Sequence, residues 1–266
     1  MGIIKIRLMI TGEGEKMSKL KIHKIIARDL PDLWFQAVND ILENGRRFVI
    51  DKGSYEGQTR LEYDYFIGHV LDPSFGSGTP EILPQINASL GIPNPVEFKY
   101  VYGGEGYERS YIEYIMTDTK QSSEQYTYGE RLRRGLRNLA LTKFYQSWEP
   151  NLDQIQEVIN TYKHHGHRNN QMVLQIAQPS DILLSDPPCL RHIDTRIQDG
   201  CLHFFIYFRS WDLWGGLPAN LAGIEALHKY MAGEIGVDQG EFIVESKGLH
   251  LYGYAEKLAE LRCMKG

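Results

Sequence analysis

The sequence contains few cysteines, no long apolar run and no excess of positive charge, and each absence excludes a class of protein. Its three cysteines, Cys189, Cys201 and Cys263, have no disulfide-framework spacing, so a reducing, cytoplasmic location is expected. No apolar run approaches the roughly 20 residues of a transmembrane helix, so no membrane partner is expected. The net charge of −5 does not indicate a DNA-binding surface.

The remaining composition is that of an ordinary globular domain. Hydrophobic residues make up 42% and charged residues 24% of the 266 residues, which excludes global disorder and allows one large core. Residues 17–266 are therefore expected to form a single domain. Residues 1–16 are expected to be an N-terminal extension, because a stretch of Gly, Glu and Lys precedes Met17.

Hydrophobic periodicity predicts three helices. The first covers Leu30–Leu42, with Asp29 as its N-cap and Gly45 in the left-handed position after its end. Another begins near Leu217 and accommodates Pro218 in its first turn.

The remaining predicted helix lies between these two in the sequence and covers about Leu152–His165. Asn151 and Gln154 are expected to form its capping box. Three histidines gather at its end: His164, His165 and His167. No cysteine or carboxylate stands near them at metal-ligand spacing, and positive charge suits a helix C-terminus, so no metal site is expected.

Strand patterns follow this helix. Asp199-Gly200 is typical of a tight hairpin turn between two of them. The predicted strands are residues 171–177, 191–197, 201–208 and 241–245. Helices mixed with a mainly antiparallel or mixed sheet indicate the α+β class. Residues 71–126 give no clear pattern, and no glycine-rich phosphate loop is found in the chain.

Cys189 is the most unusual of the three thiols, because Pro187 and Pro188 stiffen the chain just before it. A nucleophile and a core filler both fit this context, whereas Cys201 fits the core and Cys263 is expected to be inert. About twenty residues later an aromatic strand ends in the polar run Arg209-Ser210-Trp211-Asp212. Such side chains are costly to bury unless they are paired.

Taken together and in order, these motifs resemble those of the thymidylate synthase family. The matching segments are Tyr128-Gly129 with Arg131, Asp153-Gln154-Ile155 leading to Arg168, Pro187-Pro188-Cys189, Arg209-Ser210-Trp211-Asp212, Gly216-Leu217-Pro218-Ala219-Asn220 and His250-Leu251-Tyr252. The resemblance covers about residues 128–252. The end of the chain at Gly266, soon after the last motif, is similar to the short archaeal-type branch of the family.

The resemblance implies a large mixed sheet packed with helices and a homodimer formed sheet to sheet. It implies methylation of dUMP at carbon 5 to dTMP, without a metal. The co-substrate would be 5,10-methylenetetrahydrofolate or a related reduced pterin, which supplies both carbon and hydride.

The same resemblance implies roles for residues around the base. Cys189 would attack carbon 6, and Arg209 beside it would favour the thiolate. An amide can donate to O4 of uracil and accept from its N3–H, which is the role implied for Asn220. Tyr128 would help a proton leave carbon 5. Asp212, together with Gly216 and Trp211, would hold the folate.

Further residues are implied at the sugar and the phosphate. His250 and Tyr252 would hold the sugar hydroxyl. Ser210 would assist Arg209 at the phosphate, and Arg168 would reach the phosphate of the partner subunit. The family's N-terminal phosphate arginine has no clear match, and Lys52 or Arg60 is the expected substitute.

Several positions depart from the family pattern, and they leave alternatives open. In this chain Asn169 replaces the second arginine of the family's arginine pair, and Leu190 replaces a histidine. Phe208 replaces a glutamine, and Ala219 replaces a phenylalanine. Without a C-terminal segment closing over the folate, water could reach the reactive carbon and give a hydroxymethyl product. A dUMP hydroxymethylase of the same fold is therefore one alternative, and a nucleotide- or RNA-binding relative without activity is another.

Overall fold

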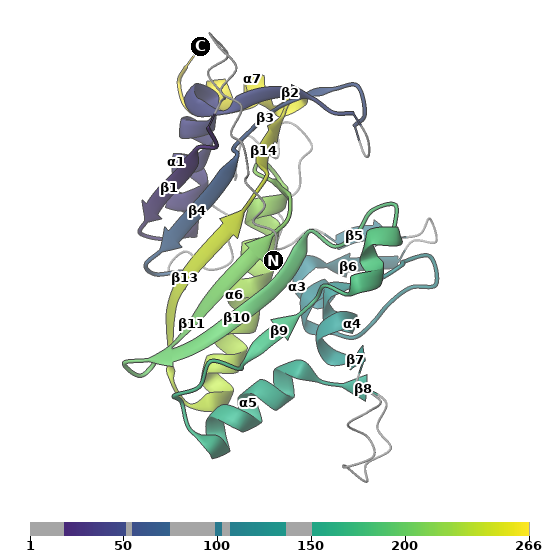
Figure 1. Cartoon of the computed structure of the whole chain (residues 1–266), viewed down its shortest axis with the longest axis vertical. Helices are drawn as coiled ribbons and strands as arrows, with labels where there is room; N and C mark the ends of the chain where they lie inside the picture. The colour runs from purple at the N-terminus through teal and green to yellow at the C-terminus, as the bar shows by residue number, and fades with distance from the viewer. Residues whose placement is uncertain (1–18, 52–54, 75–98, 103–106, 137–150, 266) are drawn as a thin grey trace, which may run out of the picture.

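Figure 1 presents the computed structural model of the chain, which describes residues 19–51, 55–74, 99–102, 107–136 and 151–265. The expected N-terminal extension and Lys52 lie outside these ranges. The division into an extension and one domain stays a prediction. Within the described ranges, one hydrophobic core joins residues from Ile25 to Ala259.

A mixed six-stranded sheet forms the centre of the fold (Figure 1). Its strands, in spatial order, are β1 (Ile22–Ala27), β4 (Tyr65–Val70), β13 (Asp238–Ser246), β11 (Cys201–Phe208), β10 (Leu190–Gln198) and β9 (Val173–Gln175). The β1–β4 and β11–β13 pairs are parallel, and the other pairs are antiparallel. The large mixed sheet packed with helices that the sequence predicts is thus confirmed.

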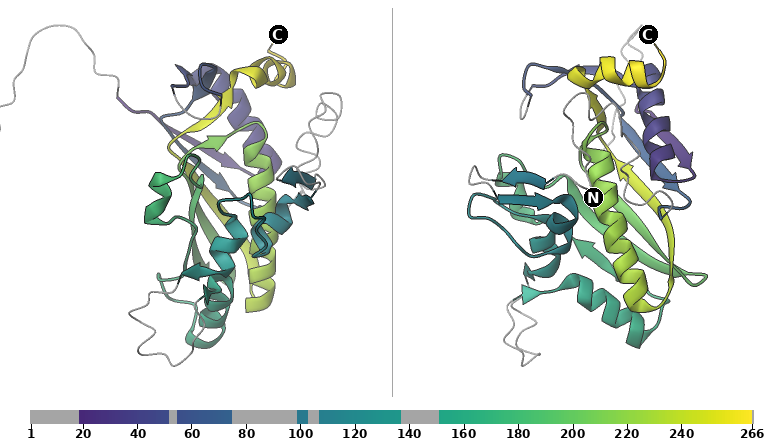
Figure 2. Two further views of the ribbon diagram at one scale, coloured as in Figure 1. Left: turned by 90° about the vertical axis from the view of Figure 1, so that its right-hand side faces the viewer. Right: turned by 180° about the vertical axis from the view of Figure 1, so that it is seen from behind.

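Three long helices cover one face of this sheet. They are α1 (Leu30–Asn44), α5 (Gln154–His165) and α6 (Gly216–Ile235). Figure 2 shows α6 running along the back of the sheet, whereas Figure 1 looks onto the face that these helices leave uncovered. The shorter helices are α3 (Tyr111–Met116), α4 (Tyr128–Arg133), η2 (Pro179–Leu183) and α7 (Gly253–Arg262).

A smaller four-stranded sheet continues directly from the large one. Its order is β12 (Trp211–Asp212), β14 (Leu249–Tyr252), β3 (Thr59–Glu62) and β2 (Arg46–Val49). Two residues, Arg209 and Ser210, connect β11 in the large sheet to β12 in the small one. Two further pairs complete the sheets: β5 (Lys99–Tyr102) with β6 (Tyr107–Ser110), and β7 (Gly135–Leu136) with β8 (Asn151–Leu152).

The buried side chains follow the predicted periodicity. Strand β11 alternates between buried and half-buried residues, and its buried side chains face the helices. Helix α6 is buried along most of its length, because it packs on the sheet and is flanked by the helices α1, α3 and α5. The Asp199-Gly200 turn is also as predicted, since both residues have positive φ values, 54° and 81°.

At one end of each of two helices, α1 and α5, the observed cap differs from the predicted one. Asp29 caps α1 by accepting from the Asp32 N–H at 2.8 Å, as expected, but Gly45 has a φ of −66° and is not left-handed. Glycine is needed there because a Cβ would lie 2.6 Å from the carbonyl oxygen of Ile41. Helix α5 is capped by Asp153 and not by Asn151, which pairs in β8.

Two searches of the described residues bear on membranes and metals. None of the described helices combines the length and the apolar character needed to cross a bilayer. The same residues include no group of three or more His, Cys, Asp or Glu side chains that could hold a metal ion.

Helix α6 carries a buried histidine that makes the fold sensitive to acid. His228 has no exposed surface, and its Nε2 donates to the carbonyl oxygen of Leu202 at 2.6 Å. Gln239 Nε2 lies 3.3 Å from His228 Nδ1, so the neutral ring has a partner at each nitrogen. Burial lowers the pKa of His228 from 6.5 to about 4.

We expect the free energy of unfolding to fall by about 2 kcal/mol between pH 7 and pH 5 because of His228. The unfolded chain binds a proton in this window and the folded chain does not, so stability is lost as the pH falls. Urea unfolding at both pH values should show a smaller loss for His228→Gln than for the unaltered protein. His164→Gln, at the exposed end of α5, is the control and should behave like the unaltered protein. Equal losses for His228→Gln and its control would contradict this role.

Candidate functional site

Cys189 is held against the end of β11 by Arg209. The Arg209 backbone N–H donates to the carbonyl oxygen of Cys189 at 2.8 Å. The Arg209 guanidinium donates through Nε to Pro188 O at 3.1 Å and through Nη2 to Pro187 O at 2.5 Å. The two sequence motifs that suggested a thiol site are therefore in direct contact.

The Cys189 thiol is subject to opposing influences. Burial is the largest and raises its pKa above the ordinary value. Arg209 acts in the opposite direction, as the sequence predicts, and Arg191 adds a smaller effect of the same sign. Asp186 lies 3.6 Å from Arg209 Nη2 and weakens that effect. The net result is a thiol that is mainly protonated near neutral pH.

Tyr128, at the start of α4, lies next to this thiol. Its hydroxyl accepts from the Leu190 N–H at 3.3 Å, and the side chain is buried. Burial raises its pKa, so the phenol is neutral. Gly129 follows because a Cβ at that position would lie 1.8 Å from the carbonyl oxygen of Thr117. The glycine of the predicted Tyr-Gly pair is thus required for steric reasons.

The small sheet brings a second group of predicted residues to one face. Asp212 on β12 is in register with His250 on β14, and Tyr252 on the same strand is in register with Arg60 on β3. The His250 and Tyr252 rings meet edge to face at 4.6 Å. Burial, mainly, raises the pKa of Tyr252 to about 12, and the charge of Asp212 contributes to this shift. Asp212, His250, Tyr252 and Arg60 therefore lie together on one face of the small sheet.

The Asp212 carboxylate holds the start of α6. Its oxygens accept from the backbone N–H groups of Trp214 at 3.0 Å, Gly215 at 3.2 Å and Gly216 at 3.0 Å. Burial raises its pKa, and these three donors oppose that shift. Gly216 thus contacts Asp212 through its backbone, whereas contact of either residue with a folate stays a prediction.

His250 presents an acceptor without a partner. Its Nδ1 lies 2.9 Å from the carbonyl oxygen of Gly248 and donates to it. Burial lowers the pKa of His250 to about 4, so the ring is neutral and Nε2 carries a lone pair. Nε2 is buried and has no hydrogen-bond partner among the described residues. A ligand hydroxyl could supply the missing donor.

Asn220 lies one turn into α6, and both ends of its amide are occupied. Its Oδ1 accepts from Trp211 Nε1 at 2.8 Å, and its Nδ2 donates to the hydroxyl of Tyr111 at 2.6 Å. Trp211 is buried and stacks on Phe208, with ring centroids 4.1 Å apart. The contact of Trp211 with the co-substrate stays a prediction, and its indole N–H is occupied by the Asn220 amide.

Three other residues were predicted to bind the phosphate: Arg60, Ser210 and Arg168. Arg60 forms an ion pair with Glu62 at 2.6 Å, and Ser210 is half-buried in the connection between the sheets. Arg168 is exposed and lies at the far end of β10 from Cys189. Eight residue steps along that strand span about 26 Å, so Arg168 does not reach Cys189 of its own chain.

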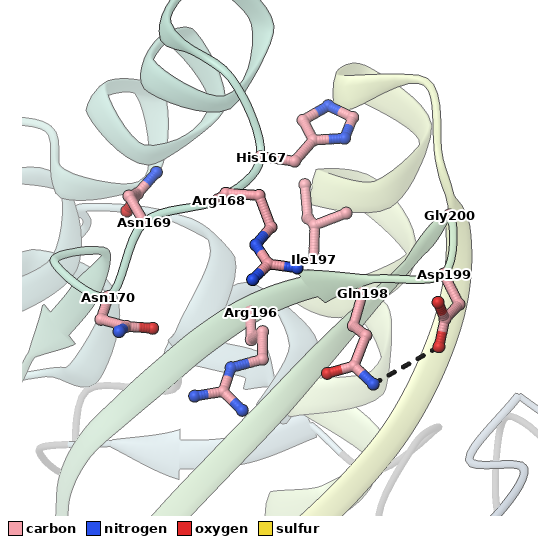
Figure 3. Close-up of a pocket in the computed structure, with 9 residues that line it drawn as sticks. All are labelled: His167, Arg168, Asn169, Asn170, Arg196, Ile197, Gln198, Asp199 and Gly200. Carbon is pink, nitrogen blue, oxygen red and sulfur yellow. Dashed lines mark hydrogen bonds between the residues drawn. The ribbon is translucent and has the colours of Figure 1, made fainter.

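Figure 3 shows the surface pocket that surrounds Arg168. It has a volume of about 480 Å³, and Arg196 from β10 lines it as well. Because this pocket lies near the Asp199-Gly200 turn, it is separate from the cluster around Cys189.

Sequence reasoning missed three residues of the site. Tyr126 donates to the carbonyl oxygen of Asp186 at 3.1 Å, and burial raises its pKa. The spacing Tyr126-x-Tyr128 is a signal that could have identified it. Asp186 directly precedes the proline pair and could have been named as a charge near Cys189. Tyr111 lies in the stretch that gave no pattern, so the sequence carried no signal for it.

Comparisons with known proteins identify a matching family and several relatives. The family model described as "Thymidylate synthase" matches residues 115–263, more than half of the chain. Similar curated proteins named "Putative thymidylate synthase" come from archaea. The Methanosarcina acetivorans protein is 26% identical over 91% of this chain and 95% of its own. The Methanosarcina mazei and Methanothermobacter thermautotrophicus proteins are 25% and 24% identical and cover similar shares of both chains, 90% or more.

We expect Arg209→Gln to raise the pKa of Cys189, because the largest opposing charge is removed. In a Cys201→Ser/Cys263→Ser background, Cys189 is the single thiol, and its alkylation by iodoacetamide can be followed against pH. The pH of half-maximal rate should increase, and the rate at pH 8 should fall about threefold to tenfold. Arg191→Gln is the matched control and should produce a smaller shift. An unchanged midpoint in Arg209→Gln would contradict the electrostatic role of Arg209.

Proposed function

The chain belongs to the thymidylate synthase family, and we propose that it converts dUMP to dTMP by methylation at carbon 5. The observation that carries this proposal is the contact of Pro187-Pro188-Cys189 with Arg209. Cys189 is the nucleophile and Arg209 a binding residue. The carbon and the hydride come from 5,10-methylenetetrahydrofolate or a related reduced pterin.

The first step is addition of the Cys189 thiolate to carbon 6 of the uracil ring. The new S–C bond displaces the π electrons of the C5=C6 bond, and negative charge develops on O4. The Asn220 amide donates to O4 and accepts from N3–H, which stabilises this charge. The proximity of Arg209 offsets part of the burial that keeps the thiol protonated.

Carbon 5 then attacks the one-carbon unit, and its own proton must leave. Tyr128 supports this proposal because it is a neutral, buried phenol whose oxygen accepts from Leu190 N, next to the thiol. It can relay that proton to water. Loss of the amine from the one-carbon unit, hydride transfer to the methylene carbon and expulsion of Cys189 complete the turnover to dTMP.

The sugar and the phosphate are assigned to groups that are available for them. His250 Nε2, a buried lone pair without a partner among the described residues, accepts from the sugar hydroxyl, and Tyr252 lies beside it. Arg209 and Ser210 bind the phosphate, with Arg60 or Lys52 as an additional cation. Asp212 holds the pterin through acceptor positions that its three backbone donors leave unused.

The position of Arg168 supports a sheet-to-sheet homodimer. Strand β10, which spans about 26 Å, separates this residue from Cys189 of its own chain, so its proposed phosphate contact is assigned to a partner subunit. The face of the large sheet that α1, α5 and α6 leave uncovered carries exposed apolar residues such as Ile22 and Ile26. A second copy packed there would bury them.

The product identifies the reaction. Mass spectrometry of a mixture of protein, dUMP and methylenetetrahydrofolate should detect dTMP and dihydrofolate. Cys189→Ala should bind dUMP but release no tritium from its 5-position, because no adduct forms. Cys201→Ala, a cysteine on β11, is the matched control and should keep turnover. Hydroxymethyl-dUMP with tetrahydrofolate would support the hydroxymethylase alternative instead, and turnover by Cys189→Ala would refute the mechanism.

Subunit mixing tests the dimer. Cys189→Ala and Arg168→Gln should each have little activity alone. After the two are unfolded together and refolded, about half of the dimers are hybrids with one complete site, so activity should return to about a quarter of the unaltered level. Two Cys189→Ala preparations treated in the same way provide the control. Failure of the hybrids to recover activity, with light scattering showing a monomer, would rule out the shared site.

A further inference from the structure

The amide of Asn220 is clamped between two aromatic side chains that come from different parts of the fold. Trp211 reaches it from the small sheet and Tyr111 from α3, at 2.8 Å and 2.6 Å. Both partners are nearly buried, at 2% and 8% exposure. Trp211 is fixed by its parallel stack on Phe208, and Tyr111 lies against α6 at Gly223, where a Cβ would be 2.7 Å from its ring.

The two partners differ in what they impose on the amide. An indole N–H can only donate, so the atom of Asn220 that faces Trp211 must be the oxygen. A phenol hydroxyl can donate or accept, so Tyr111 would accommodate either end of the amide. Trp211 therefore determines the direction of the amide, and Tyr111 adapts to it. A flipped amide would place an N–H against the indole N–H.

This direction decides which pyrimidine the amide can read. The clamp uses one lone pair of Oδ1 and one hydrogen of Nδ2, so one of each is left for a ligand. Uracil offers an acceptor at O4 and a donor at N3, whereas cytosine offers a donor at N4 and an acceptor at N3. An amide that can rotate by 180° matches either base, but an amide held in one direction matches only one.

We propose that Trp211 is a specificity-determining residue, which excludes dCMP by preventing the Asn220 amide from flipping. The proposal rests on the proposed function, because it requires Asn220 to face the base. Trp211 acts through Asn220 and is a positioning residue. It accounts for the buried tryptophan in the Arg-Ser-x-Asp motif and for Phe208 beneath it, because the phenyl ring supports the indole.

The test compares the binding of dUMP and dCMP by calorimetry. Trp211→Phe keeps the stack on Phe208 but removes the N–H. It should lower the preference for dUMP over dCMP by about tenfold, as expected for the loss of one hydrogen bond. Tyr111→Phe is the matched control and should change this ratio by about twofold at most, because the indole still fixes the oxygen.

A second background separates orientation from general loss of structure. In Asn220→Asp the two carboxylate oxygens are equivalent, so there is no direction to fix, and the preference should shift towards dCMP. Adding Trp211→Phe to Asn220→Asp should leave the base ratio unchanged. A further change of about tenfold in that background would overturn the proposal, because it would mean that Trp211 acts on the base without Asn220.

An independent measurement does not require any Trp211 variant to fold. The indole N–H signal of Trp211 in a ¹⁵N-tryptophan spectrum should move in Asn220→Ala, which removes the acceptor, and an unmoved signal would overturn the proposal. If the unaltered protein binds neither nucleotide, the proposed function fails and this inference fails with it. If it prefers dUMP and Trp211→Phe keeps that preference, the inference alone is refuted.

Discussion

The hydrogen bonds of the half-buried Asp212 carboxylate are the interaction on which much of the site depends. A carboxylate shielded from water needs strong donors, and Asp212 obtains three from Trp214, Gly215 and Gly216, where the chain enters α6. These bonds fix where α6 begins, and hence where Asn220 lies one turn later. They also anchor β12, whose pairing with β14 brings His250 next to Asp212. One side chain thus aligns the central helix, the junction of the two sheets and the proposed base and sugar contacts.

Local patterns predicted the elements whose geometry is determined locally. The periodicity of α1 and α6, the cap at Asp29 and the Asp199-Gly200 turn are all confirmed. The expected left-handed backbone at Gly45 was wrong. Glycine is required there by its close approach to Ile41, and its φ is ordinary. The parallel pairing of β1 with β4 joins segments about forty residues apart in sequence, and no short-range pattern indicates such a partner.

The candidate site shows the same difference between features determined locally and features that depend on distant segments. Motif order alone placed Cys189 near Arg209, and the two are in contact. Charge counting could not predict that burial outweighs Arg209 and raises the pKa of Cys189, because burial depends on the whole fold. Tyr111 could not be found, since its contact with Asn220 spans more than a hundred residues.

The tryptophans have a practical consequence. Trp34 and Trp214 are buried with ring centroids 5.2 Å apart, and Trp211 is hydrogen-bonded to the amide of Asn220. The indole is the strongest fluorophore in a protein, and its emission responds to hydrogen bonding at Nε1. A molecule that redistributes hydrogen bonds at Asn220 therefore alters the emission of Trp211 directly. The protein carries a built-in optical reporter at the point where the base would be read, and occupancy can be followed there without a label.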